Sequence, residues 1–151
     1  MHKIIISDTS CFIVLNNIGE LELLHKSYDI IITTNEVVSE FGSGLPEWVI
    51  IQSPKDKSKQ KILEMQLDKG EASAIALAIE THDCSIILDD QKARKIAEQY
   101  GLEITGTIGV IIKAKKKGLI TSIKPILQKL KSSGFRYSND IELEALKEAG
   151  E

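Results

Sequence analysis

Short apolar runs that end in a polar side chain recur along the chain, and no other feature limits the possible folds as strongly. KIIIS at 3–7, DIIIT at 29–33 and SIILDD at 85–90 are rich in isoleucine, and hydroxyl or carboxylate residues follow each one at once. Runs of this length and composition are typical of strands buried on both faces of a sheet. WVIIQSP at 48–54 predicts an edge strand, and LEITG at 102–106 predicts a further short strand.

Helical patterns separate these predicted strands. They cover CFIVLNNIG, ELELLHKSY, NEVVSEF, KDKSKQKILEMQL, KGEASAIALAIETHD, QKARKIAEQYG, TIGVIIKAKKKG, SIKPILQKLKSSG and NDIELEALKEAG. Strands that alternate with helices favour a mainly parallel sheet with helices on both faces. The sequence therefore predicts one α/β domain over residues 1–151, a three-layer α/β/α arrangement with a helical extension from about residue 120 to 151.

Acidic residues stand at the ends of the predicted strands and on the neighbouring helices. Asp8 follows the first strand, and Asp89 and Asp90 end another. Glu40 lies late in the helix after the second strand, and Glu71 begins the alanine-rich helix. Ligands of open α/β sheets bind outside the carboxyl ends of the strands, so these acids can meet at one edge. Taken singly, an acid after a strand is more simply explained as a helix cap.

Carboxylates that meet at one edge repel one another at neutral pH, and folds avoid such clusters unless a cation neutralises them. A ligand set of oxygen atoms without His or Cys favours Mg²⁺ or Mn²⁺. Such an ion can orient and activate a water molecule and stabilise negative charge on a phosphate. The acids therefore predict hydrolysis of a phosphodiester.

Four segments carry a resemblance to a known family: IIISDTS with Asp8, VVSEF with Glu40, GEASAIALA with Glu71, and IILDD with Asp89 and Asp90. In their order and spacing the chain resembles the PIN-domain nucleases, particularly the compact prokaryotic VapC-type toxins of toxin–antitoxin pairs. GTIGVIIKAKKKGLI and the basic stretch after it resemble one branch of that superfamily. The resemblance covers nearly the whole chain.

The resemblance implies a Mg²⁺- or Mn²⁺-dependent endoribonuclease, with an antitoxin protein as partner and a homodimeric state. Its catalytic residues would be Asp8, Glu40, Glu71 and Asp90, and its metal ligands Asp8, Glu71, Asp89 and Asp90. Asp90 is the closer match within the doublet, and Asp89 would lie near the metal or substitute for it. The hydroxyls of Thr9 and Ser10 would lie beside the ligands and the substrate. Many relatives carry Asp where Glu71 stands, and the shortest toxins lack the C-terminal extension.

Charge is divided unevenly along the chain. Residues 1–90 carry 7 Lys and Arg against 15 Asp and Glu, whereas residues 91–151 carry 12 against 7. RNA phosphates are the natural partners of such a basic half, through attraction that does not depend on sequence. Lys92 and Lys95 directly follow the Asp doublet and are predicted to bind the substrate. For the more distal lysines, an ordinary solvated helix surface is an equal explanation.

Three other functions remain to be weighed. A phosphoacceptor receiver domain carries its acidic doublet after the first strand, whereas here the doublet comes late. A dinucleotide-binding domain needs GxGxxG after a strand, and none is present. A PIN-like module that binds RNA or a protein without cutting is the serious rival, because fold does not determine function.

Cysteine usage and hydropathy bear on the compartment. Cys11 and Cys84 lack a CxxC partner, which predicts two buried thiols. No apolar run approaches the roughly 20 residues that cross a bilayer, and the N-terminal apolar run is too short for a signal peptide. The sequence thus predicts a cytoplasmic protein.

Overall fold

The sheet is parallel throughout. The computed structural model describes residues 4–151, and its five strands are β1 (Ile4–Ser7), β2 (Ile30–Thr33), β3 (Val49–Ile51), β4 (Cys84–Ile87) and β5 (Glu103–Thr105). They lie in the order β3-β2-β1-β4-β5, and every neighbouring pair is parallel. This confirms the predicted α/β class. Since all five strands point the same way, all of their carboxyl ends lie at one edge.

Alternate isoleucines of the central strands enter opposite hydrophobic clusters. Ile6, Ile32 and Ile86 belong to one cluster, and Ile5, Ile31 and Ile87 belong to the other. Successive strand side chains point to opposite faces of a sheet, so an unbroken apolar run serves two cores at once. This is why the runs read as continuously apolar in the sequence.

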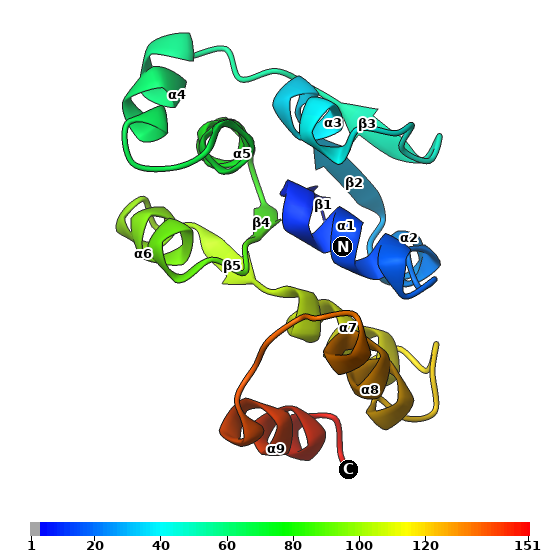
Figure 1. Ribbon diagram of the computed structural model, residues 1–151. Helices are drawn as coiled ribbons and strands as arrows, with labels where there is room; N and C mark the ends of the chain where they lie inside the picture. Colours follow the sequence, from blue (N-terminus) through cyan, green and yellow to red (C-terminus); the bar gives the residue numbers. More distant parts are fainter. Residues whose placement is uncertain (1–3) are drawn as a thin grey trace.

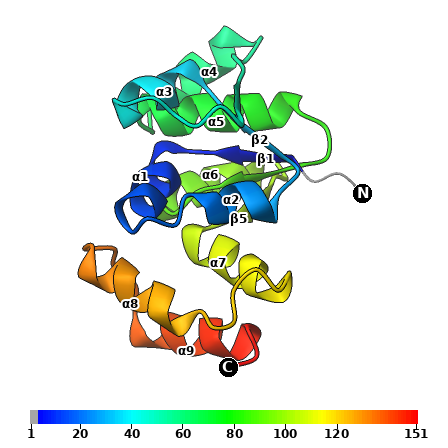
Figure 2. The same cartoon turned by 90° about the vertical axis from the view of Figure 1, so that its right-hand side faces the viewer.

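Helices cover both faces of this sheet, as Figures 1 and 2 show. Residues of α4 (Lys57–Glu64), α5 (Lys69–Glu80) and α6 (Gln91–Gln99) enter the first cluster. Residues of α1 (Thr9–Asn17), α2 (Glu22–Ser27) and α7 (Thr107–Lys116) enter the second. The short helix α3 (Asn35–Phe41) contacts both α1 and α5. The three-layer α/β/α prediction is confirmed.

A third cluster attaches the C-terminal extension to the outer side of α7. Leu127 of α8 (Lys124–Ser132) and Ala145 of α9 (Asn139–Glu148) are buried there with Ile111 of α7. The chain end is also held, because the Glu151 carboxylate accepts hydrogen bonds from the Ser122 hydroxyl (2.6 Å), the Ile123 amide (2.7 Å) and the Lys115 ammonium group (3.0 Å). These donors lower the pKa of Glu151 to about 2.

Side-chain caps explain why several helices begin where the strands end. The carboxylates of Asp8, Asp68 and Asp90 accept from the backbone N–H groups of Cys11 (3.3 Å), Glu71 (2.8 Å) and Ala93 (2.9 Å). Such a bond satisfies one of the free amides of the first helical turn and contributes about 1 kcal/mol. Each cap also carries its carboxylate to the start of a helix. The capping explanation that the sequence allowed for these acids therefore holds for Asp8 and Asp90.

Two predictions need correction or refinement. Cys11 is buried as predicted, but Cys84 is only partly buried, because it opens β4 at the amino edge of the sheet. The predicted edge strand at 48–54 is reduced to Val49–Ile51, since its partner β2 ends at Thr33, whose carbonyl accepts the last bond from the Gln52 amide.

Candidate active site

Asp8 is the most enclosed acid at the carboxyl edge. It follows β1, and only 2% of its surface is exposed. Burial raises its pKa well above the usual value, and the negative charges of Asp89, Glu71 and Asp68 raise it further. The Cys11 amide acts in the opposite direction but does not compensate. An acid so placed is costly as a bare carboxylate and favours a nearby cation.

Two donors hold the Glu40 carboxylate, one at the start of α1 and one at the start of α5. The Thr9 hydroxyl donates to Oε1 (2.6 Å), and the Gly70 amide donates to Oε2 (3.2 Å). Gly70 leaves room for this arrangement, since a Cβ there would overlap Glu40 Oε1 and lie 2.9 Å from the Thr9 hydroxyl, so that the Glu40 carboxylate would have to shift. The ends of α1, α3 and α5 are thereby joined through one carboxylate. The sequence pointed to Thr9 as a supporting hydroxyl, and this is the contact it makes.

Glu71 stands one residue further along α5 and is partly buried. Burial, together with the carboxylates of Asp68 and Asp90 and a smaller effect of Glu40, raises its pKa to about 7. Glu71 is thus within electrostatic reach of acids from α3, α5 and the end of β4. Asp68, which was not among the site residues predicted from the sequence, belongs to the same acidic group.

Asp89 is held by the first residue of α7. The backbone N–H and the hydroxyl of Thr107 donate to its two oxygens, at 2.9 and 2.6 Å. Gly106 allows this approach, because a Cβ there would lie 2.9 Å from Asp89 Oδ1 and 3.0 Å from Arg94 Nη1. Arg94 in turn donates to the Leu88 carbonyl (2.8 Å), which ties α6 to the end of β4. Asp89 is therefore oriented by a neighbouring strand–helix junction.

The two members of the Asp doublet face different acids. Asp89 is the largest charged influence on Asp8, whereas Asp90 acts on Glu71. Asp90 also caps α6 through Oδ2, as described above. Both doublet positions therefore belong to the acidic group at this edge.

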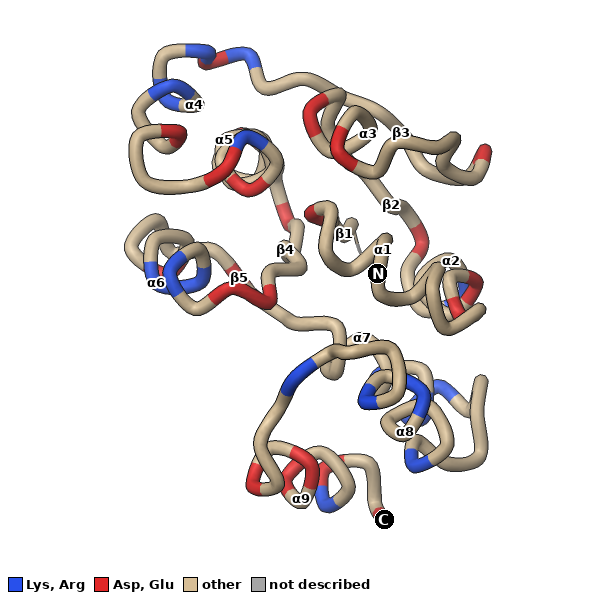
Figure 3. Tube along the Cα trace, in the orientation of Figure 1, with Lys and Arg blue, Asp and Glu red and all other residues tan. Residues whose placement is uncertain are grey.

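These acids surround one region at the front of the view in Figure 3, where acidic segments of α1, α3, α5 and the β4–α6 junction gather. Within residues 4–151, no three His, Cys, Asp or Glu side chains stand close enough to hold a metal ion as they are arranged. Caps and Thr contacts direct several of the oxygens elsewhere. The chemistry of the donors still fits Mg²⁺ or Mn²⁺, because a buried Asp8 and a Glu71 of raised pKa are what uncompensated hard-cation ligands produce.

The remaining predicted residues lie at the rim of this site. Ser10 is exposed on the first turn of α1. Lys92 and Lys95 are exposed on the first turns of α6, directly after Asp90. A substrate phosphate held there would therefore lie next to the acids.

Sequence reasoning passed over Thr107, Asp68 and Gly70. Thr107 carries no charge, so a search for carboxylates could not select it. Its one signal is position, because GT at 106–107 follows a strand at the same edge as Asp8 and Asp89. Asp68 carries a usable signal as well, since it precedes Glu71 by the three residues that separate a cap from the amide it binds.

A family model for the PIN domain matches residues 4–151. The chain belongs to the PIN-domain family. PIN domains are generally nucleases that use divalent metals, so membership supports a hydrolase. The match includes α8 and α9, so the C-terminal extension is part of this type of PIN domain. A search of curated proteins returned no match.

In the described chain, no helix is long and apolar enough to cross a membrane.

When no metal is bound, we expect the acids at the carboxyl edge to make the free energy of unfolding fall as pH rises. An unfolded Glu loses its proton near pH 4.3, whereas the folded Glu71 keeps its proton up to about pH 7. The folded state therefore binds more protons in this range, and stability falls as pH rises through it. Asp8, whose pKa is also raised, acts in the same direction. The urea midpoint in EDTA should be higher near pH 5 than near pH 8.

Mn²⁺ should reverse this loss near pH 8, because a ligand of the native state alone adds stability by mass action. Glu71→Gln should flatten the pH dependence in EDTA. A midpoint that rises with pH in EDTA would contradict the raised pKa values of these acids, and one unchanged by Mn²⁺ would contradict a metal site at this edge.

Proposed function

We propose that this PIN domain is a divalent-metal-dependent endoribonuclease that hydrolyses phosphodiester bonds of RNA. The observation that carries the proposal is the enclosed Asp8, which lies at the carboxyl edge of a parallel sheet within electrostatic reach of Asp89, Glu71 and Asp68. Family membership supplies the reaction class, and the basic residues beside the acids favour a polyanionic substrate.

Four of the acids would bind the metal ion, and Glu40 would lie beside them. Asp8, Glu71, Asp89 and Asp90 are the residues that would hold Mg²⁺ or Mn²⁺. When bound, the cation would activate a water molecule and stabilise charge on the scissile phosphate. Glu40 is oriented by Thr9 and Gly70 and would add a further carboxylate beside the metal ligands. Thr107 binds both oxygens of Asp89 and so would fix the direction of that carboxylate.

The test is a cleavage assay on single-stranded RNA with purified protein in Mn²⁺, Mg²⁺ or EDTA. Internal cleavage in either metal and its loss in EDTA are expected. Exonucleolytic shortening would contradict the endonuclease assignment, and equal cleavage in EDTA would contradict the metal requirement.

Neutralising Lys92 and Lys95 should weaken RNA binding more than it affects folding. Both side chains are exposed on α6, and the double change to Ala leaves the helix-forming pattern intact. Each lost phosphate contact should lower the slope of log affinity against log salt by roughly one. Fluorescence anisotropy across a salt series measures this slope. As a matched control, the exposed Lys57 and Lys61 on α4 are changed together; an equal loss in that variant would reassign the effect to overall charge.

A PIN-like module that binds RNA or protein without cutting is the second candidate. The arrangement that favours it is the use of acid oxygens in caps and Thr contacts, with no three acids in the described chain close enough to hold an ion. RNA binding without cleavage in any metal would support this candidate over the nuclease.

The resemblance to VapC-type toxins extends the first proposal to a toxin held in check by an antitoxin partner. Induced expression should then arrest growth, and Asp8→Asn should not. A neighbouring reading frame for a short DNA-binding protein would support the pairing, whereas normal growth on expression of active nuclease would oppose it.

A further inference from the structure

A second concave surface begins beside the acidic edge and is formed by the C-terminal extension. A cleft of about 1130 Å³ lies between the β5–α7 junction and α9 with the segment before it. Asp89 and Arg94 line one end of it, so the cleft is continuous with the candidate active site. The extension thus adds a groove to the site as well as a third hydrophobic cluster.

The segment that joins α8 to α9 supplies two aromatic rings and a cation to this cleft. Phe135, Arg136 and Tyr137 all line it. The two rings lie 6.2 Å apart between centroids and are tilted by 46°. The Tyr137 hydroxyl donates to the Leu127 carbonyl (3.0 Å), which fixes that ring against α8. Arg136 is exposed, and no hydrogen bond or ion pair is recorded for its side chain within residues 4–151. A rigid ring pair beside an unengaged cation is suited to a nucleotide.

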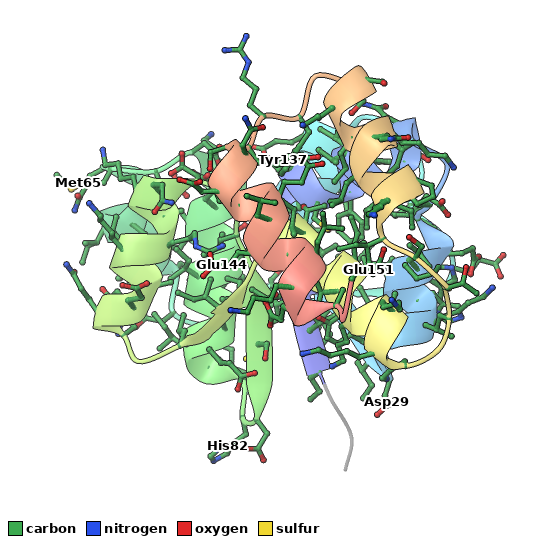
Figure 4. All side chains as sticks on the ribbon, turned by 90° about the horizontal axis from the view of Figure 1, so that it is seen from below. Asp29, Met65, His82, Tyr137, Glu144 and Glu151 are labelled. Atoms are coloured by element: carbon green, nitrogen blue, oxygen red, sulfur yellow. The ribbon has the colours of Figure 1, made fainter. Side chains whose placement is uncertain are left out.

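This aromatic segment lies at the same edge as the acids. Figure 4 shows Tyr137 at the opposite end of the molecule from Asp29 and His82, which precede β2 and β4. The amino ends of the strands therefore lie far from Tyr137, and the carboxyl ends lie towards it. Glu144, which also lines the cleft, lies further along α9 in the same view. The end of the cleft that meets the active site is thus its cationic and aromatic end.

We infer that this end of the cleft binds single-stranded RNA next to the scissile phosphate. A base would stack on Phe135, and the adjoining phosphate would contact Arg136. Tyr137 would line the site beside them, since the Lys131 ammonium group already lies over its ring, 5.3 Å from the centroid. Stacking on aromatic rings combined with arginine contacts to phosphate is a common mode of single-strand binding. A double helix would not offer its bases to these rings, so the cleft selects unpaired RNA. This inference rests on the proposed function, because it takes RNA as the substrate.

The test is equilibrium binding of a fluorescein-labelled oligouridylate in EDTA, where cleavage plays no part. Arg136→Ala should weaken binding about five- to tenfold and lower the salt slope by about one. Phe135→Leu should weaken it about fivefold or more, because it removes the ring on which the base stacks. Phe135→Tyr keeps the ring and should bind as the wild type does. Lys124→Ala, which removes an exposed cation of the extension outside the cleft, should change the affinity by less than about twofold.

Thermal melts of the same variants separate binding from folding. Phe135 is partly buried against the third cluster, and leucine conserves most of its apolar volume. If Phe135→Leu nevertheless fails to fold, the exposed Arg136 carries the test alone. Wild-type affinity in Arg136→Ala and in a folded Phe135→Leu would overturn the inference and leave the cleft to another ligand class, such as a peptide. Cleavage by the wild type would in that case still support the nuclease. Cleft-dependent RNA binding without cleavage would instead overturn the nuclease and support the cleft.

Discussion

Replacing Asp8 with asparagine should abolish RNA cleavage and at the same time stabilise the metal-free protein. Asn keeps the oxygen that caps Cys11, so α1 should begin as before. It removes the charge at the centre of the proposed ligand set, and losing one electrostatic contribution of this kind typically costs about 10²–10³-fold in rate. The rate should be measured with RNA in Mn²⁺ under single-turnover conditions.

The stability gain follows from the same burial. The raised pKa of Asp8 means that its ionised form is unfavourable in the fold, and near pH 8 an amide no longer bears that cost. Each kcal/mol gained should raise the melting temperature by about 2–4 °C in a chain of this size. Mn²⁺, in contrast, should stabilise the variant much less than the wild type.

Asp83→Asn is the matched control. Asp83 is exposed at the amino end of β4 and has a φ of 53°, a backbone conformation that asparagine accepts readily. It should change neither cleavage nor the response to Mn²⁺. Wild-type cleavage by Asp8→Asn would mean that the reaction occurs elsewhere on the chain or in a contaminant.

Thr107→Val should have the second largest effect. Valine matches threonine in shape but lacks the hydroxyl that donates to Asp89 Oδ2, while the backbone amide still donates to Oδ1. Asp89 can then rotate away from the direction in which it faces Asp8. Loss of a residue that orients a metal ligand typically reduces metal affinity or activity about 10- to 100-fold.

Thr107→Val should also lower the free energy of unfolding, but by no more than the contribution of one hydrogen bond. A hydrogen bond to a charged group contributes about 1.5–3 kcal/mol, and water replaces part of it because Asp89 is partly exposed. Urea unfolding of the metal-free protein measures this cost. Thr107→Ser restores the hydroxyl and should recover most of the cleavage rate. If valine and serine variants cut RNA equally well, the orientation of Asp89 has no part in the reaction.

Local sequence determined the strands, most helix starts and the acids at the sheet edge. Isoleucine-rich runs such as 3–7 and 85–90 bury both faces, and Asp8 and Asp90 cap the helices that follow, so periodicity and capping within a few residues suffice to predict them. A parallel sheet then places those acids at one edge whatever the order of its strands. The fold class and the acids at the strand ends could therefore be predicted from patterns that extend over only a few residues.

Only the tertiary structure decided which groups meet. Thr107 reaches Asp89, and Gly70 reaches Glu40, because β5 lies beside β4 and α5 lies beside α3. These pairs are 18 and 30 residues apart, a separation at which no helical or strand period relates one residue to the other. The cleft of the extension has the same origin, since the residues before α9 meet Asp89 only after α7, α8 and α9 have packed together. Chemistry-bearing residue types can thus be read from local pattern, whereas their partners depend on contacts that form when distant segments bury a common core.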